Sequence, residues 1–249
     1  MIAARLGMLA RRGTVPLGYL VIVLAVLRPP WAALGRSIAT GTEPCDTVPF
    51  ALTWAIGWGM SRIDALARGD LAGAVAYWDA PIFHPTPGAF ALSEPMPALA
   101  LIGWPLHALG VPLAAVVTSL VVACLLANGM MMRRWLLHLR TGWLLATVGG
   151  VIACMLPFVH QELGVLPLVA IWPLLWMLTA TLDLLGRARP LRRAGVELGL
   201  ATVVAFACCG QLTLFTALLL VPAGACLVRF DRLRGSFAIA ATLAAGIAA

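Results

Sequence analysis

The chain is dominated by apolar segments that are each close to the length of a membrane-spanning helix. A helix needs about 20 apolar residues to cross the hydrocarbon core, within a range of roughly 17–25. The segments are residues 14–34, 111–132, 141–159, 163–185, 194–210, 211–228 and 235–249. We therefore expect an all-α integral membrane fold, because a helix satisfies its own backbone hydrogen bonds in lipid.

The number of segments predicts how this bundle is built. The first six give about six complete transmembrane helices, whereas the last stops at Ala249 inside an apolar run. This predicts a truncated seventh helix. On this interpretation, residues 1–249 form a single transmembrane domain and are the N-terminal fragment of a longer protein.

The amino-acid composition agrees with a membrane protein. Hydrophobic residues make up 62% of the 249 residues and charged residues only 11%, whereas a soluble domain carries about a quarter charged residues. The formal net charge of +7 comes from arginine, because the chain has no lysine. These arginines stand near the ends of apolar segments instead of on one soluble face, so we expect no nucleic-acid partner.

The arginines also predict the orientation in the membrane, because basic loops stay in the cytoplasm. Four clusters hold most of them: Arg5, Arg11 and Arg12; Arg133, Arg134 and Arg140; Arg187, Arg189, Arg192 and Arg193; and Arg229, Arg232 and Arg234. If all four clusters are cytoplasmic, the N-terminus is cytoplasmic and 111–132 is the one crossing between 36 and 132. The loop 36–110 and the turn 157–163 then lie outside.

The outer loop has a helical pattern of its own. Phe50, Trp54 and Trp58 recur every four residues, which predicts an aromatic stripe on a helix that lies in the headgroup region. Asp64 and Arg68 are spaced as an ion pair on the continuation of that helix. The stretch 96–110 is too short to span as well as 111–132, so we expect a second juxtamembrane helix along the outer surface.

Asp46 is the first candidate for chemistry. It follows the first apolar segment in the run Thr42-Glu-Pro-Cys-Asp46. Spacing alone favours a loop acid, or an N-cap for a helix that begins near Pro49. The functional alternative is a general base, which needs a carboxylate within hydrogen-bond reach of an acceptor hydroxyl.

Two further acids and two histidines stand in the predicted outer segments. His160 and Glu162 belong to a polar turn between apolar helices, where they are costly unless paired or solvated. His84 and Glu94 stand in a Pro- and Gly-rich stretch and are candidates for headgroup binding. Together with Asp46 these residues could bind a divalent metal ion, although their spacing fits no known metal motif and the six cysteines add none.

Two arginines are candidates for contact with membrane lipid. Arg28 closes the apolar part of the first segment and Arg36 opens the outer loop. A long side chain at this position reaches back to the headgroups. Arginine also binds phosphate through two parallel hydrogen bonds, so either residue could hold a lipid phosphate.

Three of these features together resemble the GT-C superfamily of multi-pass membrane glycosyltransferases. They are an acid soon after the first helix, the segment FHPTPGAFALSEPMPALALIGWPL over 83–106, and the polar turn 157–162. The nearest similarity is to the broad bacterial group of mannosyltransferase-like or uncharacterised GT-C proteins. The resemblance covers most of 14–230 as architecture.

The resemblance implies an inverting transferase in a bacterial cytoplasmic membrane, with a polyprenyl-phosphate sugar as donor. Asp46 matches the catalytic acid of the first outer loop, and Glu162 matches by position a second acid after the third span. The turn reads His-Gln-Glu where the family has an Asp motif. The donor phosphate would lie near Arg28 or Arg36, and His160 would help Glu162 to orient the acceptor or a metal ion.

Two other functions stay open at this point. One is a non-catalytic GT-C-like protein that binds a lipid-linked glycan. The other is a transporter or flippase, although such proteins place ionisable residues within their spans, and Asp183 and Glu197 stand near predicted helix ends. The sequence identifies no protein partner, sugar or acceptor.

Overall fold

The computed structural model describes residues 2–27, 35–42, 47–82, 85–186 and 190–227. Within these ranges the regular structure is helical and no β-strand is formed, which confirms the all-α prediction. The chain divides into two compact units, Met1–Ala170 and Ile171–Ala249. The interpretation of residues 1–249 as one transmembrane domain stays a prediction.

Each of the first six apolar segments overlaps one or more helices. In the first unit they are α1 (Ile2–Leu27), α2 (Thr47–Ala67), α3 (Leu71–Val75), the 3₁₀ turns η2 (Ala76–Trp78) and η3 (Ala89–Leu92), α4 (Pro97–Ala108), α5 (Leu113–His138), α6 (Trp143–Cys154), α7 (Pro157–Gln161) and α8 (Leu166–Val169). In the second unit they are α9 (Trp172–Gly186), α10 (Leu191–Cys208) and α11 (Gly210–Leu227).

Two described stretches are long and apolar enough to cross a membrane. They are Leu113–His138, which is α5, and Trp143–Gln161, which joins α6 to α7. Shorter apolar helices cover Thr14–Leu27, Trp172–Leu185 and Gly210–Ala223. The number of complete spans, the cytoplasmic N-terminus and the truncated seventh helix stay predictions; the seventh segment, 235–249, lies outside the described residues.

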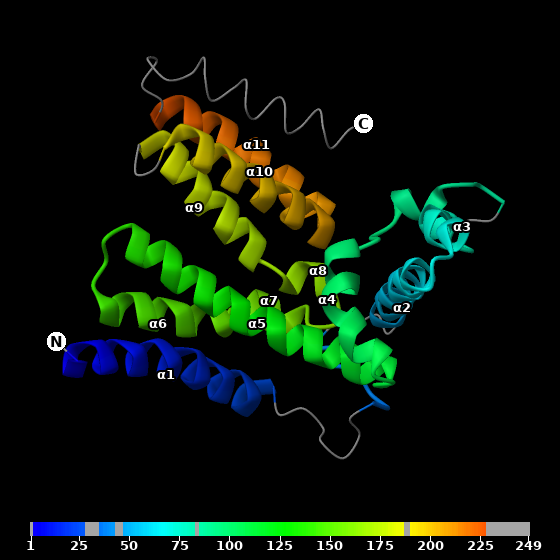
Figure 1. Ribbon diagram of the computed structural model, residues 1–249, viewed down its shortest axis with the longest axis horizontal. Helices are drawn as coiled ribbons and strands as arrows, with labels where there is room; N and C mark the ends of the chain where they lie inside the picture. Colours follow the sequence, from blue (N-terminus) through cyan, green and yellow to red (C-terminus); the bar gives the residue numbers. More distant parts are fainter. Residues whose placement is uncertain (1, 28–34, 43–46, 83–84, 187–189, 228–249) are drawn as a thin grey trace. The chain divides into compact units, whose positions relative to one another are not determined.

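Helices α1, α5 and α6 run side by side in the first unit (Figure 1). Small residues let them approach closely. A Cβ added at Gly150 would overlap the Tyr19 hydroxyl and stand 2.8 Å from the Gly129 carbonyl oxygen. That hydroxyl donates to the Thr147 carbonyl oxygen at 2.9 Å. Close backbone contact through small residues is the usual way in which helices pack in a membrane.

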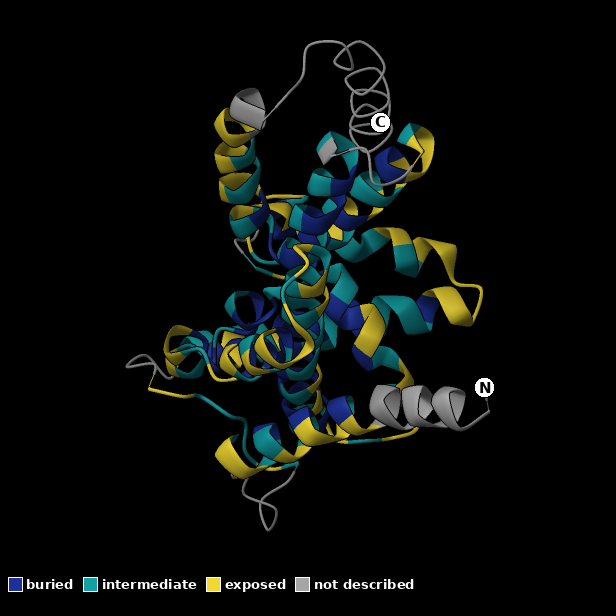
Figure 2. Cartoon of the chain, turned by 90° about the vertical axis from the view of Figure 1, so that its left-hand side faces the viewer, coloured by how far each residue is buried: buried dark blue, intermediate teal, exposed yellow. Residues whose placement is uncertain are grey.

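The outward faces of these helices remain apolar. On α6 the exposed residues include Leu144, Leu145, Val148 and Ile152. Exposed residues, yellow in Figure 2, occupy helix faces that point away from neighbouring helices. A contiguous apolar surface of this kind is unusual for a soluble protein and suits contact with lipid.

Two of the apolar segments contain a break between helices. The segment 141–159 breaks at Met155–Leu156, directly before Pro157, which begins α7. The segment 163–185 breaks at Ala170–Ile171, between α8 and α9. Proline lacks a backbone N–H and restricts the residue before it, so a helix ends readily ahead of it.

Helices α2 and α4 pack next to the beginning of α5. In Figure 1, α4 runs across the direction of α5 instead of along it. A Cβ at Gly103 of α4 would meet Val116 Cγ1 at 2.9 Å and Leu120 Cδ1 at 3.2 Å, so α4 crosses α5 near its first turns. Helix α4 confirms the helix predicted within 96–110. Its orientation relative to a membrane stays a prediction.

The second unit is a packed group of α9, α10 and α11. Trp176 Nε1 donates to Glu197 Oε1 at 3.1 Å and so joins α9 to α10. Asp183 lies one turn before the end of α9 and is only 1% exposed. Cys209 has extended backbone and separates α10 from α11.

Candidate functional site

Three of the predicted site residues lie outside the described residues: Arg28, Asp46 and His84. The roles assigned to them stay predictions. The structure does place Arg36, Glu94, His160 and Glu162, together with the segments that flank Asp46 on both sides.

The loop after α1 pairs with the turn after α7. The Thr42 backbone N–H donates to the Gln161 carbonyl oxygen at 3.0 Å, and the Gly164 N–H donates to the Thr40 carbonyl oxygen at 3.2 Å. Gly41 has φ +68°, and a Cβ there would overlap the carbonyl oxygens of His160 and Gln161. Only glycine fits this close approach at positive φ.

The beginning of α2 touches the same turn. A Cβ at Gly164 would stand 2.6 Å from Pro49 Cγ. Thr42 and Thr47 are the described residues on either side of 43–46, so the chain both enters and leaves this tetrapeptide beside the turn 160–164. The structure therefore brings together the two segments that the sequence analysis marked separately. We call this contact, formed by 40–42, 47–49 and 160–164, the loop junction.

His160 and Glu162 occupy the turn itself. His160 Nε2 lies 3.0 Å from the Cys154 carbonyl oxygen, which is one of the carbonyls left free at the end of α6. Glu162 is the C-terminal cap of α7, and its N–H donates to the Phe158 carbonyl oxygen at 3.1 Å. Both residues are partly exposed. His160 therefore has a structural role at the end of α6.

Arg36 and Glu94 lie elsewhere in the first unit. Arg36 is exposed, next to Gly35, whose added Cβ would stand 3.3 Å from Pro112 at the start of α5. Glu94 is half-buried, and this burial raises the pKa of its carboxyl above the ordinary value. Beside it the Tyr77 hydroxyl donates to the Pro95 carbonyl oxygen at 2.7 Å.

A metal site is not formed by the placed residues alone. Within the described ranges, no group of three or more His, Cys, Asp or Glu side chains could hold a metal ion. Two of the predicted ligands, Asp46 and His84, fall outside those ranges. The divalent ion stays a prediction.

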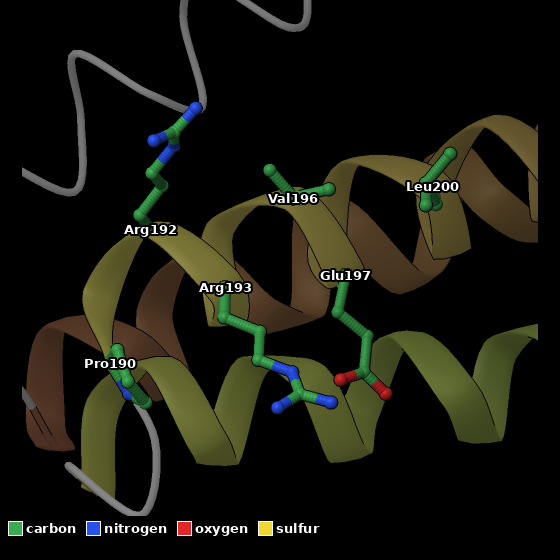
Figure 3. Close-up of a pocket in the computed structure, with 6 residues that line it drawn as sticks. All are labelled: Pro190, Arg192, Arg193, Val196, Glu197 and Leu200. Atoms are coloured by element: carbon green, nitrogen blue, oxygen red, sulfur yellow. The ribbon is translucent and has the colours of Figure 1, made fainter.

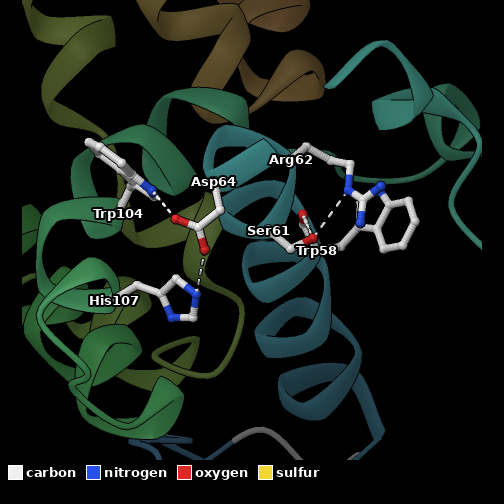
Figure 4. A network of polar contacts seen from close by, with 6 residues as sticks. All are labelled: Trp58, Ser61, Arg62, Asp64, Trp104 and His107. Atoms are coloured by element: carbon white, nitrogen blue, oxygen red, sulfur yellow. Dashed lines mark hydrogen bonds and ion pairs between the residues drawn. The ribbon is translucent and has the colours of Figure 1, made fainter. Parts of the chain in front are cut away.

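The structure adds one polar cluster that sequence reasoning missed (Figure 4). Asp64 Oδ1 accepts from Trp104 Nε1 at 2.7 Å, and Asp64 Oδ2 lies 3.3 Å from His107 Nε2. The predicted Asp64–Arg68 pair is wrong, since no ion pair between these two described residues is formed. Asp64 points instead to α4, where Trp104 and His107 are one turn apart. The three-residue spacing of Trp104 and His107 was the sequence feature that could have predicted this cluster.

The second unit has an open hollow of about 480 Å³ near the start of α10 (Figure 3). Its described lining is Pro190, Arg192, Arg193, Val196, Glu197 and Leu200. Arg193 and Glu197 point to one side of α10 and Arg192 to the other. The described lining comes from a single helix and its N-terminal cap, so the hollow is not a site for chemistry on the described residues.

Comparison with known proteins adds no relative: no family model, curated protein or solved structure matches the chain.

Proposed function

We propose that this chain is part of a multi-pass glycosyltransferase of GT-C type in a bacterial cytoplasmic membrane. The enzyme takes a sugar from a polyprenyl-phosphate donor and transfers it to an acceptor at the outer face. The resemblance of the sequence to that superfamily motivates the proposal.

The loop junction is the single observation that supports this proposal best. A transferase needs its acids gathered at one place on one face of the membrane. Thr42 pairs with Gln161, and Pro49 stands beside Gly164. The described residues on both sides of 43–46, the tetrapeptide that contains Asp46, therefore meet the turn that carries Glu162, although the two acids are more than a hundred positions apart.

The reaction is a displacement at the anomeric carbon. Asp46 accepts the proton of the acceptor hydroxyl as its oxygen attacks that carbon. The new glycosidic bond forms while the bond from carbon to phosphate oxygen breaks, and the polyprenyl phosphate leaves with the bonding electrons. Inversion follows because attack and departure occur on opposite faces. Glu162 and His160 orient the acceptor, and Arg28 or Arg36 holds the donor phosphate.

The test is sugar transfer by the full-length protein that contains this chain. Proteoliposomes would receive synthetic polyprenyl-phosphate mannose or glucose, and transfer to lipid or glycan acceptors would be measured. We expect Asp46→Asn to lower turnover by about 10²–10⁴-fold, the usual contribution of a general base. Glu162→Gln should lower it less, because orientation is only weakened.

Glu43→Gln is the matched control, since it removes a neighbouring carboxylate from the same loop. It should leave turnover close to that of the unmodified protein. Unchanged turnover in Asp46→Asn would refute the assignment of the base. Absence of transfer with every donor, in protein that still binds polyprenyl phosphate, would favour a non-catalytic lipid-glycan-binding protein.

A further inference from the structure

Aromatic rings from α2, η2 and η3 form a continuous cluster in the first unit. Trp54 stacks on Trp58 with ring centroids 6.1 Å apart and meets Phe90 edge-on at 6.2 Å. Phe90 lies 5.5 Å from Tyr77, which lies 4.8 Å from Trp78. Trp58 Nε1 donates to the Tyr77 carbonyl oxygen at 2.9 Å and ties the cluster to α2. We call these five rings the aromatic cluster.

The inner rings of the aromatic cluster are covered, but its two ends are not. Phe90 is fully buried, whereas Trp54 is 38% and Trp78 is 46% exposed. Large apolar side chains of α2, α3 and η3 are exposed as well: Phe50 at 65%, Leu71 at 66%, Val75 at 76% and Leu92 at 82%. Leu71, Val75 and Trp78 are four and three residues apart, so they form one stripe.

A cation stands at the end of the α2 stripe (Figure 4). Arg62 places its guanidinium carbon 4.2 Å from the centroid of the Trp58 ring. Its Nε donates to Ser61 Oγ at 3.2 Å and its Nη1 to the Gly73 carbonyl oxygen at 3.2 Å. No carboxylate pairs with it among the described residues. Neighbouring Asp70 instead caps α3 by accepting from the Gly73 N–H at 2.8 Å.

This surface is linked to the end of a candidate membrane span. Helix α4 crosses the first turns of α5 at Gly103, and Gly59 of α2 packs on Ala100 of α4, where an added Cβ would stand 2.8 Å from Ala100 Cβ. The aromatic cluster is therefore two helices away from the N-terminal end of α5. If α5 crosses the membrane, that level is the headgroup region, where Trp and Tyr are enriched.

We infer that the aromatic cluster, with the exposed residues of α2 and α3, docks on the headgroup region of the bilayer, and that Arg62 binds the phosphate of an anionic phospholipid. The partner is lipid because the exposed set is rich in leucine, valine and phenylalanine, which insert between acyl chains. A sugar ring would use the tryptophans but not these aliphatic side chains. The guanidinium of Arg62 has no carboxylate partner among the described residues, so its charge complements a phosphate. Its planar donors can bind two phosphate oxygens. This inference requires a membrane-embedded α5, but not sugar transfer.

Depth measurements test the docking surface directly. A nitroxide on a keto amino acid at position 75 leaves the native cysteines unchanged. The same label at position 68 is the control, because Arg68 is an exposed charged residue beyond the end of α2 and outside the stripe of Leu71, Val75 and Trp78. In nanodiscs of the whole chain, oxygen should collide with the label at 75 more often than a water-soluble nickel chelate does. The reverse should hold at 68.

Two outcomes would overturn the docking surface. If the nickel chelate collides with the label at position 75 as often as with the label at position 68, the exposed residues of α3 lie in water. If neither reagent reaches 75, protein covers it, which would be a second copy of the chain or another partner.

Arg62 is tested separately by lipid retention. Whole protein would be purified from micelles that contain equal amounts of phosphatidylglycerol and phosphatidylcholine, and the retained lipids counted by mass. Arg62→Gln should lower the retained ratio of phosphatidylglycerol to phosphatidylcholine about fivefold, the effect of one basic residue at an anionic surface. Arg68→Gln should leave it unchanged, and Arg62→Lys should keep part of it. An unchanged ratio in Arg62→Gln, or an equal loss in both glutamine variants, would refute a specific phosphate contact.

Discussion

At the scale of single residues, Gly41 has the most specific role in the loop junction. Gly41 and Gly88 both have φ +68°, but only Gly41 has close neighbours, the carbonyl oxygens of His160 and Gln161. An added methyl at Gly88 meets nothing within 4 Å. Alanine substitutions at the two positions therefore separate the free-energy cost of backbone strain from the cost of losing the contact.

We expect Gly88→Ala to cost about 1–2 kcal/mol, the usual penalty for a side chain in the left-handed region. Gly41→Ala should cost clearly more, because the loop must also move away from the turn. Thermal unfolding of both variants in detergent measures the difference. Equal midpoints would show that the loop junction contributes nothing to stability.

Glu94 gives a pH-dependent prediction. Burial raises the pKa of Glu94 in the folded protein, so folding favours the protonated carboxyl. The stability that the protonated carboxyl contributes is fully present below the pKa of the unfolded chain, and it is lost as the pH rises through the pKa of the folded protein. Glu94→Gln should therefore raise the melting temperature at pH 7 and have little effect at about pH 4.

Melting curves across this pH range check the Glu94 prediction. Asp79→Asn is unsuitable as a control, since Asp79 Oδ1 accepts from the Gly88 N–H at 2.8 Å. Glu43→Gln is a better control because it removes an acid from a different part of the same outer loop. If Glu94→Gln raises the melting temperature by the same amount at low pH as at pH 7, burial of the charged carboxylate is not the cause.

At the scale of elements, Asp64 fastens α2 to α4. Its two oxygens take separate partners, Trp104 at 2.7 Å and His107 at 3.3 Å. Trp104→Phe keeps the ring and removes the donor, so we expect a loss of about 1 kcal/mol for this partly exposed bond. Combined with Asp64→Ala, the two losses should be less than additive, because both variants remove the same bond.

Trp143→Phe is the control for this cluster, since Trp143 is 47% exposed at the start of α6. It should change the unfolding midpoint little. If the losses of unfolding free energy in Trp104→Phe and Asp64→Ala are strictly additive in the double variant, the hydrogen bond from Trp104 to Asp64 does not form in solution.

The sequence allowed most elements to be predicted but not their interruptions. Apolar length and the four-residue spacing of Phe50, Trp54 and Trp58 predicted the helices, because both depend on local periodicity. The breaks at Met155–Leu156 and Ala170–Ile171 depend on how the backbone avoids Pro157 and on packing, which hydropathy does not report. The partner of Asp64 was predicted wrongly for a related reason. The sequence places Arg68 four residues away, whereas the fold brings Trp104 and His107 to Asp64 from another helix.

At the scale of the whole molecule, the sequence predicted only part of the candidate site. It predicted Asp46 and Glu162 on the outer face, but it could not show that the residues flanking 43–46 touch the turn that carries Glu162. That contact comes from backbone pairing at Thr40, Thr42 and Gly164, which leaves no side-chain signature apart from the glycines. Of the aromatic cluster, the sequence predicted only the stripe on α2. Tyr77 and Phe90 join it from η2 and η3, and local spacing does not predict that contact.

The central prediction is that the loop junction and the α2 region stand on the outer side of the membrane, and that the arginines at the start of α10 stand on the cytoplasmic side. Single cysteines at positions 68, 161 and 192, all exposed, would be treated with a membrane-impermeant thiol reagent in intact cells and in inverted vesicles. We expect labelling of positions 68 and 161 only in intact cells, and of position 192 only in inverted vesicles. Labelling of 192 in intact cells, or labelling of 68 and 161 from opposite sides, would contradict it.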